Sequence, residues 1–161
     1  MGFASHLGPW LLGTVKNTTG TTAGTIRNMG ATVVTQSNTM TVSDTTAKTL
    51  FVLPAGAQIN NFLVDITTAF AGTTGNTITI QTAAGASLAT VGSATTTPLS
   101  IGRATTAATG AQVATWLNVG STDLIVQVIY ACAGVASGGA ATVTVSYTVK
   151  DSDGSANPSQ V

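Results

Sequence analysis

Residues 139–149 read GAATVTVSYTV, and from Ala141 onward apolar and hydroxyl side chains alternate without a break. Successive side chains of an extended strand point to opposite faces, so this stretch has one apolar face and one hydroxyl face. The two faces are Val143, Val145, Tyr147 and Val149 against Thr142, Thr144, Ser146 and Thr148. The pattern predicts a strand that packs one face on a core and leaves the other in water.

The same two-residue period recurs along the chain, whereas helical periodicity is almost absent. It is found in TMTVS (39–43), in NTITIQT (76–82), and in QVATWLNV (112–119) as a further candidate strand. Residues 49–70 predict a buried strand, a turn at Pro54-Ala55-Gly56, and a second strand with Phe62, Val64 and Ile66 inward. These signals predict an all-β protein, an antiparallel, jelly-roll-like β-sandwich of about eight strands.

Three parts are expected along the 161 residues. Residues 1–36 form an extended N-terminal arm, residues 37–150 the sandwich, and residues 151–161 a polar C-terminal tail. Residues 92–110 are expected to form a long loop in which Arg103 is the only charge.

Charge is scarce in this chain. Charged residues make up 6%, the formal net charge is zero, and Thr occupies 32 positions. A chain without a basic stripe is not expected to bind nucleic acid. Because a net charge near zero removes repulsion between copies, the composition favours association.

Two apolar segments have simple structural interpretations. Residues 124–143 carry no charge over a length that could span a bilayer, but Gly138-Gly139 divide them and their order is that of two strands and a turn, so no membrane contact is expected. Cys132, the single cysteine, is predicted to be a buried small apolar residue.

Catalytic groups are few. The only histidine, His6, lies in the Gly-rich arm with no partner that the sequence brings near it. Asp65 alternates with the inward residues of its strand and is expected to face solvent or an interface, while Asp44 and Asp123 occupy turn-like positions where they can accept backbone hydrogen bonds. The sequence therefore predicts a protein that is not an enzyme and that uses no cofactor and no metal ion.

A short pattern occurs twice in the arm, as Gly13-Thr14-Val15-Lys16-Asn17 and Gly24-Thr25-Ile26-Arg27-Asn28. Two strands with these sequences would place Lys16 and Arg27 on one side. One interpretation is a hairpin with its bases in solvent, and the other is an arm that docks on a partner. For docking, the expected contact residues are the two bases with a preceding apolar group, in which Trp10 is the anchor: Phe3, Leu7, Trp10, Leu11, Leu12, Lys16 and Arg27.

Two stretches resemble the decoration, or cement, proteins of tailed-bacteriophage heads. They are residues 1–34, MGFASHLGPWLLGTVKNTTGTTAGTIRNMGATVV, and residues 49–70, TLFVLPAGAQINNFLVDITTAF, with the following GNTITIQTA. The resemblance implies a β-sandwich, commonly a homotrimer, on the outer surface of the virion capsid, where it braces adjacent copies of the major capsid protein. It also implies that the N-terminal arm makes the capsid contact.

Two other functions stay open at this stage. The chain could be another part of the virion, such as a head fibre or a tail component. It could also be a carbohydrate-binding module or adhesin, although sugar sites favour exposed aromatic rings and this chain has few.

Overall fold

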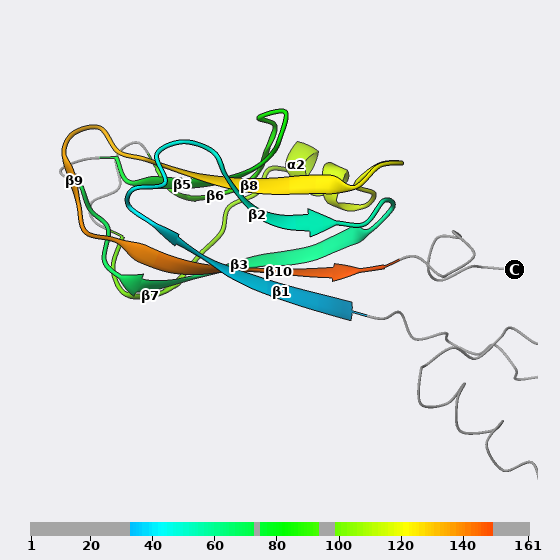
Figure 1. Cartoon of the computed structure of the whole chain (residues 1–161), viewed down its shortest axis with the longest axis horizontal. Coiled ribbons are helices and arrows are strands. Elements are labelled where there is room, and N and C mark those ends of the chain that lie inside the picture. The colour runs from blue at the N-terminus through cyan, green and yellow to red at the C-terminus, as the bar shows by residue number, and fades with distance from the viewer. Residues whose placement is uncertain (1–32, 73–74, 94–98, 150–161) are drawn as a thin grey trace, which may run out of the picture.

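The computed structural model describes residues 33–72, 75–93 and 99–149 (Figure 1). Nearly all of their regular structure is strand. In chain order the elements are β1 (Val33–Thr41), β2 (Lys48–Leu53), β3 (Gln58–Thr68), β4 (Ala71–Gly72), β5 (Thr77–Thr82), β6 (Ser87–Gly92), β7 (Gly102–Ala104), α2 (Gly110–Trp116), β8 (Leu124–Ala131), β9 (Ala136–Ser137) and β10 (Ala140–Thr148).

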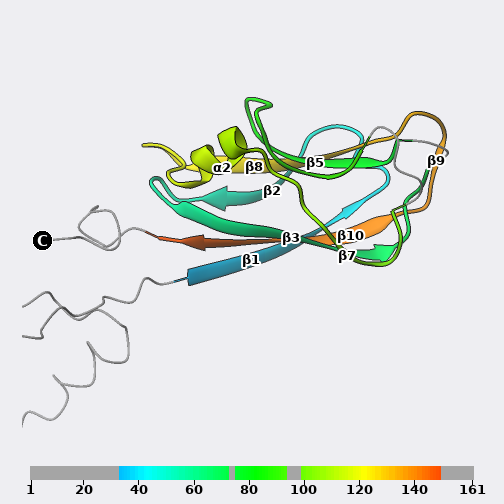
Figure 2. The same cartoon turned by 180° about the vertical axis from the view of Figure 1, so that it is seen from behind.

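Eight of these strands form two four-stranded antiparallel sheets that face each other. The order in one sheet is β1-β10-β3-β7 and in the other β2-β8-β5-β6. Figures 1 and 2 show them as two layers, and the short β4-β9 pair lies at one end of the sandwich. The predicted all-β antiparallel sandwich is confirmed.

The connections make this sandwich a jelly roll. Along the chain the eight strands of the two sheets alternate between sheets, except that β5 and β6 are neighbours in the same sheet. Each sheet therefore contains strands from both halves of the chain, which is the double Greek key arrangement. The first strand and the last lie side by side, with Val33 opposite Thr148.

The core lies between the sheets and follows the two-residue period. In β10 the buried residues are Ala141, Val143, Val145 and Tyr147, and the residues between them are only partly buried. The predicted inward residues of β3, Phe62, Val64 and Ile66, are all buried. Facing them from the other sheet are Ile78, Ile80, Val126 and Val128.

Residues 112–119, predicted to be a strand, form most of α2 instead, so this prediction was wrong. Thr109 caps the helix: its hydroxyl accepts from the Gln112 backbone N–H, and the Gln112 side chain accepts from the Thr109 N–H. This reciprocal capping box stabilises the first turn. The helix contacts β6 and β3, and the Trp116 ring meets Phe62 edge-on with 5.4 Å between ring centroids.

At two places the observed strands differ from the predicted segments. β1 begins at Val33, so residues 33–36, assigned to the arm from the sequence, pair with β10. The expected long loop 92–110 contains β7, which extends the first sheet beside β3. Residues 1–32 of the expected arm and the tail 151–161 lie outside the described residues.

The uncharged segment 124–143 forms β8, β9 and the beginning of β10. In the described part of the chain, no helix is long and apolar enough to cross a membrane.

A buried polar cluster joins β4, β5 and β8 at one end of the core. The Asn76 side chain, fully buried, accepts from the Gly72 N–H at 3.2 Å and from the Tyr130 hydroxyl, and donates to the Gly72 carbonyl at 3.2 Å. Burial, with a smaller effect of the neighbouring Cys132 thiol, raises the pKa of Tyr130 to about 12. The phenol therefore stays protonated and donates at neutral pH.

We predict that Asn76→Ala destabilises the fold by about 1–3 kcal/mol, because it leaves buried donors and an acceptor without partners. Urea denaturation at pH 7 measures the free energy of unfolding. Asn61→Ala, at an exposed position of β3, is the control and should change it by no more than about 0.5 kcal/mol. Equal losses for the two variants would contradict the role assigned to Asn76.

Candidate interaction surfaces

The seven contact residues expected from the sequence cannot be placed. Phe3, Leu7, Trp10, Leu11, Leu12, Lys16 and Arg27 all lie outside the described residues, so docking through the arm stays a prediction. The structure instead defines surfaces on the sandwich itself.

The outer face of the β1-β10-β3-β7 sheet is lined with short polar side chains, and we refer to it as the hydroxyl face. Its cross-strand rows join Thr35, Ser146 and Asn61; then Ser37, Thr144 and Leu63; then Thr39, Thr142, Asp65 and Arg103. The Ser37 and Thr144 hydroxyls share a hydrogen bond of 2.8 Å. Each hydroxyl can both donate and accept, and short side chains lose little conformational entropy when a partner covers them.

One ion pair lies at the β7 side of the hydroxyl face. Asp65 and Arg103 are directly opposite in β3 and β7, and the guanidinium binds both carboxylate oxygens, at 2.9 and 3.2 Å. The hydrogen bonds from Arg103, and secondarily its charge, hold the pKa of Asp65 below its ordinary value. The outward orientation predicted for Asp65 is correct, and its charge is balanced locally.

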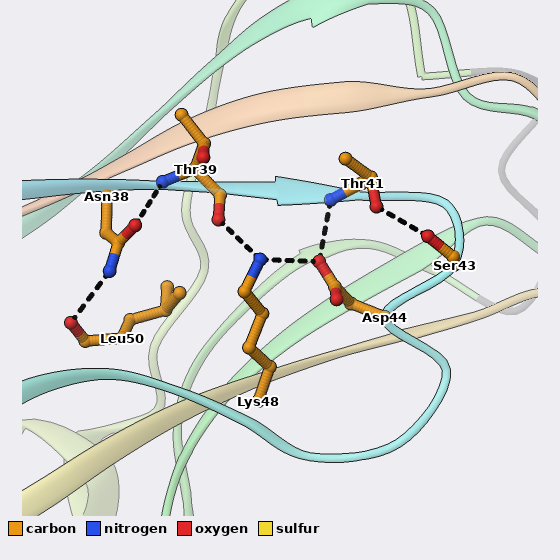
Figure 3. Close-up of polar contacts among 7 residues, drawn as sticks. All are labelled: Asn38, Thr39, Thr41, Ser43, Asp44, Lys48 and Leu50. Carbon is orange, nitrogen blue, oxygen red and sulfur yellow. Dashed lines mark hydrogen bonds and ion pairs between the residues drawn. The ribbon is translucent and has the colours of Figure 1, made fainter.

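A second polar cluster covers the corner between β1 and β2, the first strands of the two sheets (Figure 3). The Asp44 carboxylate accepts from the Thr41 N–H at 2.8 Å and pairs with Lys48 Nζ at 3.1 Å. Lys48 Nζ also donates to the Thr39 carbonyl at 2.9 Å, and Asn38 Nδ2 donates to the Leu50 carbonyl at 3.1 Å. Side chains thus satisfy backbone groups that face out of both sheets.

Asp123 has the turn role expected of it. Its carboxylate accepts from the Ala55 N–H at 3.1 Å, while the Gly56 N–H donates to the Gly120 carbonyl and the Val119 N–H to the Ala57 carbonyl. These bonds join the β2–β3 turn to the loop before β8. With Asp44 and Asp65, every aspartate among the described residues has a structural partner.

Cys132 packs against the core but is only partly buried, so the prediction of a buried small apolar residue is correct only in part. It follows β8, where the chain leaves the sheet, and its thiol donates to the Gly134 carbonyl at 3.1 Å. Trp116 is also engaged: besides contacting Phe62, its indole N–H donates to the Leu88 carbonyl at 3.2 Å. Its ring therefore packs on the protein and does not form an open platform for a sugar.

Exposed apolar side chains occur at sites that the sequence analysis did not single out. Val52 and Ile125 are cross-strand neighbours on the outer face of the second sheet, 50% and 40% exposed. Ile101 and Val135 lie beside short strands, 70% and 80% exposed. Alternation could have flagged Val52 and Ile125, since both fall out of phase with their buried neighbours.

No group of three or more His, Cys, Asp or Glu side chains that could hold a metal ion occurs in residues 33–72, 75–93 and 99–149.

Comparisons with known proteins show a likeness at the level of structure. No family model matches the chain, and no curated protein matches it. A chain of the cyanophage Pam1 capsid asymmetric unit is similar to it with a TM-score of 0.48 and 16% identity, over 84% of this chain and 98% of that one.

We predict that Arg103→Met raises the pKa of Asp65 toward its ordinary value of 3.8, which a carboxyl ¹³C NMR titration measures. A depressed folded-state pKa stabilises the fold above the unfolded-state pKa, and this contribution disappears as the pH falls through the folded-state value. The difference in stability between wild type and variant should therefore be present at pH 7 and vanish in strong acid. Lys48→Met should leave the Asp65 titration unchanged, and an equal shift in that variant would contradict the local origin.

Proposed function

We propose that this protein is a structural component of a phage virion that binds the outer surface of the head and stabilises the lattice of the major capsid protein. The proposal starts from the resemblance of residues 1–34, 49–70 and 75–83 to decoration proteins. The single structural observation that supports it is the hydroxyl face, a broad sheet surface with one balanced ion pair. Such a surface suits contact with another protein over a large area.

Binding of this kind needs no chemical step. Burial of apolar surface contributes about 25 cal/mol per Å² before the entropy of association is subtracted. Hydroxyl groups that exchange water for partner atoms contribute little net energy but fix the register of the contact. Several copies on one lattice strengthen weak contacts through avidity.

In this proposal the arm makes the capsid contact and the protein acts as a homotrimer. Trp10 would be the anchor of the apolar group in the arm, and Lys16 and Arg27 would contact acidic groups of the capsid. β1 carries the arm, and its first residue pairs with the end of β10, so the arm joins the sandwich beside the C-terminal end of the last strand.

The other two functions make different demands on the molecule. A head fibre or tail component would have the same chemistry but another location in the particle. A carbohydrate-binding module would need an exposed aromatic platform, and Trp116 is occupied by Phe62 and Leu88. Specific binding on a glycan array would favour the carbohydrate-binding function over the capsid role.

We predict that deletion of residues 1–32 abolishes attachment to heads of the phage that encodes the protein, prepared without it. Co-sedimentation with heads measures attachment. The thermal midpoint should fall by no more than about 4 °C, because the deletion ends before β1.

Deletion of residues 151–161 is the matched control and should leave attachment intact. If the variant lacking residues 1–32 attaches as well as the wild type does, the arm is not the docking element. If the full chain does not attach to heads, the proposed function itself is wrong.

We predict that attachment depends only weakly on salt. Exposed ion pairs through Lys16 and Arg27 are worth about 0.2–1 kcal/mol each and are screened at high ionic strength, so 1 M NaCl should weaken the binding of each copy by about thirtyfold at most. Lys16→Met with Arg27→Met should remove this dependence. Complete release of the protein by moderate salt would contradict binding through uncharged surface.

A further inference from the structure

β1 is an edge strand of its sheet, and its backbone groups point alternately toward β10 and away from it. The outward residues are the odd-numbered ones. The Thr39 N–H donates to the Asn38 side chain of β1 itself, and the Thr39 carbonyl and the Thr41 N–H bond to the Lys48 and Asp44 side chains. The Thr41 carbonyl accepts from the Asp44 N–H. In a regular antiparallel ladder this alternation holds along the strand, and β1 pairs with β10 without a register shift. The outward groups of β1 therefore also include those of Val33, Thr35 and Ser37.

Side chains cover the second half of this edge. The Thr39 N–H donates to Asn38 Oδ1 at 2.8 Å, the Thr39 carbonyl accepts from Lys48 Nζ at 2.9 Å, and the Thr41 N–H donates to Asp44 at 2.8 Å (Figure 3). A lysine beside the strand and polar groups that occupy the edge are the devices by which proteins block unwanted strand pairing.

The first half of the edge has no such cover. Among the described residues, no hydrogen bond reaches the outward backbone groups of Val33, Thr35 or Ser37. The segment has no proline, charge or bulge, and the side chains of these three residues are exposed. This half of β1 is a short template for one more antiparallel strand, and it lies where the N-terminal arm joins the sandwich.

We propose that the open edge of β1, residues 33–37, binds a strand from the N-terminal arm of a second copy of this chain, through Gly24–Asn28. That segment alternates Thr25, Ile26 and Arg27, as strands do, and 32 residues of chain precede Val33. An arm that begins at the open edge of one copy is placed to reach the open edge of a neighbour.

The turn chemistry disfavours the same pairing within one chain. A two-residue turn on Gly30-Ala31 would make Asn28 and Val33 a non-hydrogen-bonded pair, so the Val33 N–H and carbonyl would have to point away from residues 24–28. In β1 these groups point toward the open edge, where the added strand would lie, so this turn does not fit. A three-residue turn over residues 30–32 would place Thr32 where the left-handed conformation is usual, and a β-branched residue resists it. Gly30 is therefore at the wrong position for either of these two tight turns, and this favours exchange between copies.

An arm of one copy on the β1 edge of another joins two different surfaces, so the contact can close reciprocally in a dimer or head-to-tail in a ring such as a trimer. Each exchanged arm would become a fifth strand, beside β1, of the β1-β10-β3-β7 sheet of the neighbouring copy. The inference concerns association of the chain with itself and does not rest on the virion role.

The test uses the full chain with substitutions at Thr35. Thr35→Pro removes one outward N–H without touching the hydrogen bonds to β10, since proline is tolerated on an edge strand. Thr35→Val keeps the backbone donor and changes only the side chain. We expect sedimentation velocity to show that the wild type and Thr35→Val associate, and that Thr35→Pro and a deletion of residues 1–29 associate at least about tenfold more weakly.

Amide exchange gives a readout that does not depend on how Thr35→Pro folds. In the associated wild type the Val33, Thr35 and Ser37 amides should exchange at least about tenfold more slowly than in the variant lacking residues 1–29. Three results would overturn the proposal: unaltered association of Thr35→Pro, fast exchange of these amides in the associated wild type, or slow exchange in a monomer. Failure to bind phage heads would leave this proposal standing, so the two proposals fail separately.

Discussion

Burial of one face of each sheet against the other is the interaction on which this structure depends. With charged residues at 6% of the chain, ion pairs contribute little, and stability comes from apolar side chains that point into the core from both sheets. In β10 apolar and hydroxyl side chains alternate from Ala141 to Thr148, and four apolar side chains reach the core. The same alternation that fills the core also produces the hydroxyl face on the other side of the sheet.

In the jelly roll, strands that are far apart in the sequence pair with one another. β10 pairs with β1 on one side and β3 on the other, so the last strand holds the first two strands of its sheet together. Where strands end, specific hydrogen bonds hold the chain in place. Tyr130 donates to Asn76 at one end of the core, and Asp123 accepts from the backbone of the β2–β3 turn. The described part of the chain thus combines an apolar interior with an outer sheet face on which short polar side chains predominate.

Sequence reasoning succeeded where the two-residue period is strong. β10, β5 and the inward residues of β3 could be predicted because only one face of each strand can be buried. It failed at residues 112–119, because Val113, Trp116 and Leu117 also fit a helical period, and the decisive signal was the capping box at Thr109 and Gln112. β7 was missed because a three-residue strand is defined by its pairing with β3 and has no period of its own.

The surfaces were harder to predict than the core. The position of Asp65 on an outer face followed from alternation, but its partner Arg103 comes from 38 residues away and is set by the tertiary fold. The half-open edge of β1 could not be foreseen either, because it depends on Asn38, Asp44 and Lys48 covering only part of the strand. The expected docking residues of the arm remain predictions, since the structure does not describe them.

We propose that this protein works by fitting its surfaces against neighbouring protein chains on the outside of a phage head. Electron microscopy of intact particles, at a resolution that traces the chain, tests it most directly. The account predicts the jelly roll on the outer surface of the head, with its N-terminal arm buried against capsid protein and the edge of β1 paired with a strand. Particles in which the protein is absent from the head, or stands there with the arm free in solvent and touches no capsid chain, would contradict it.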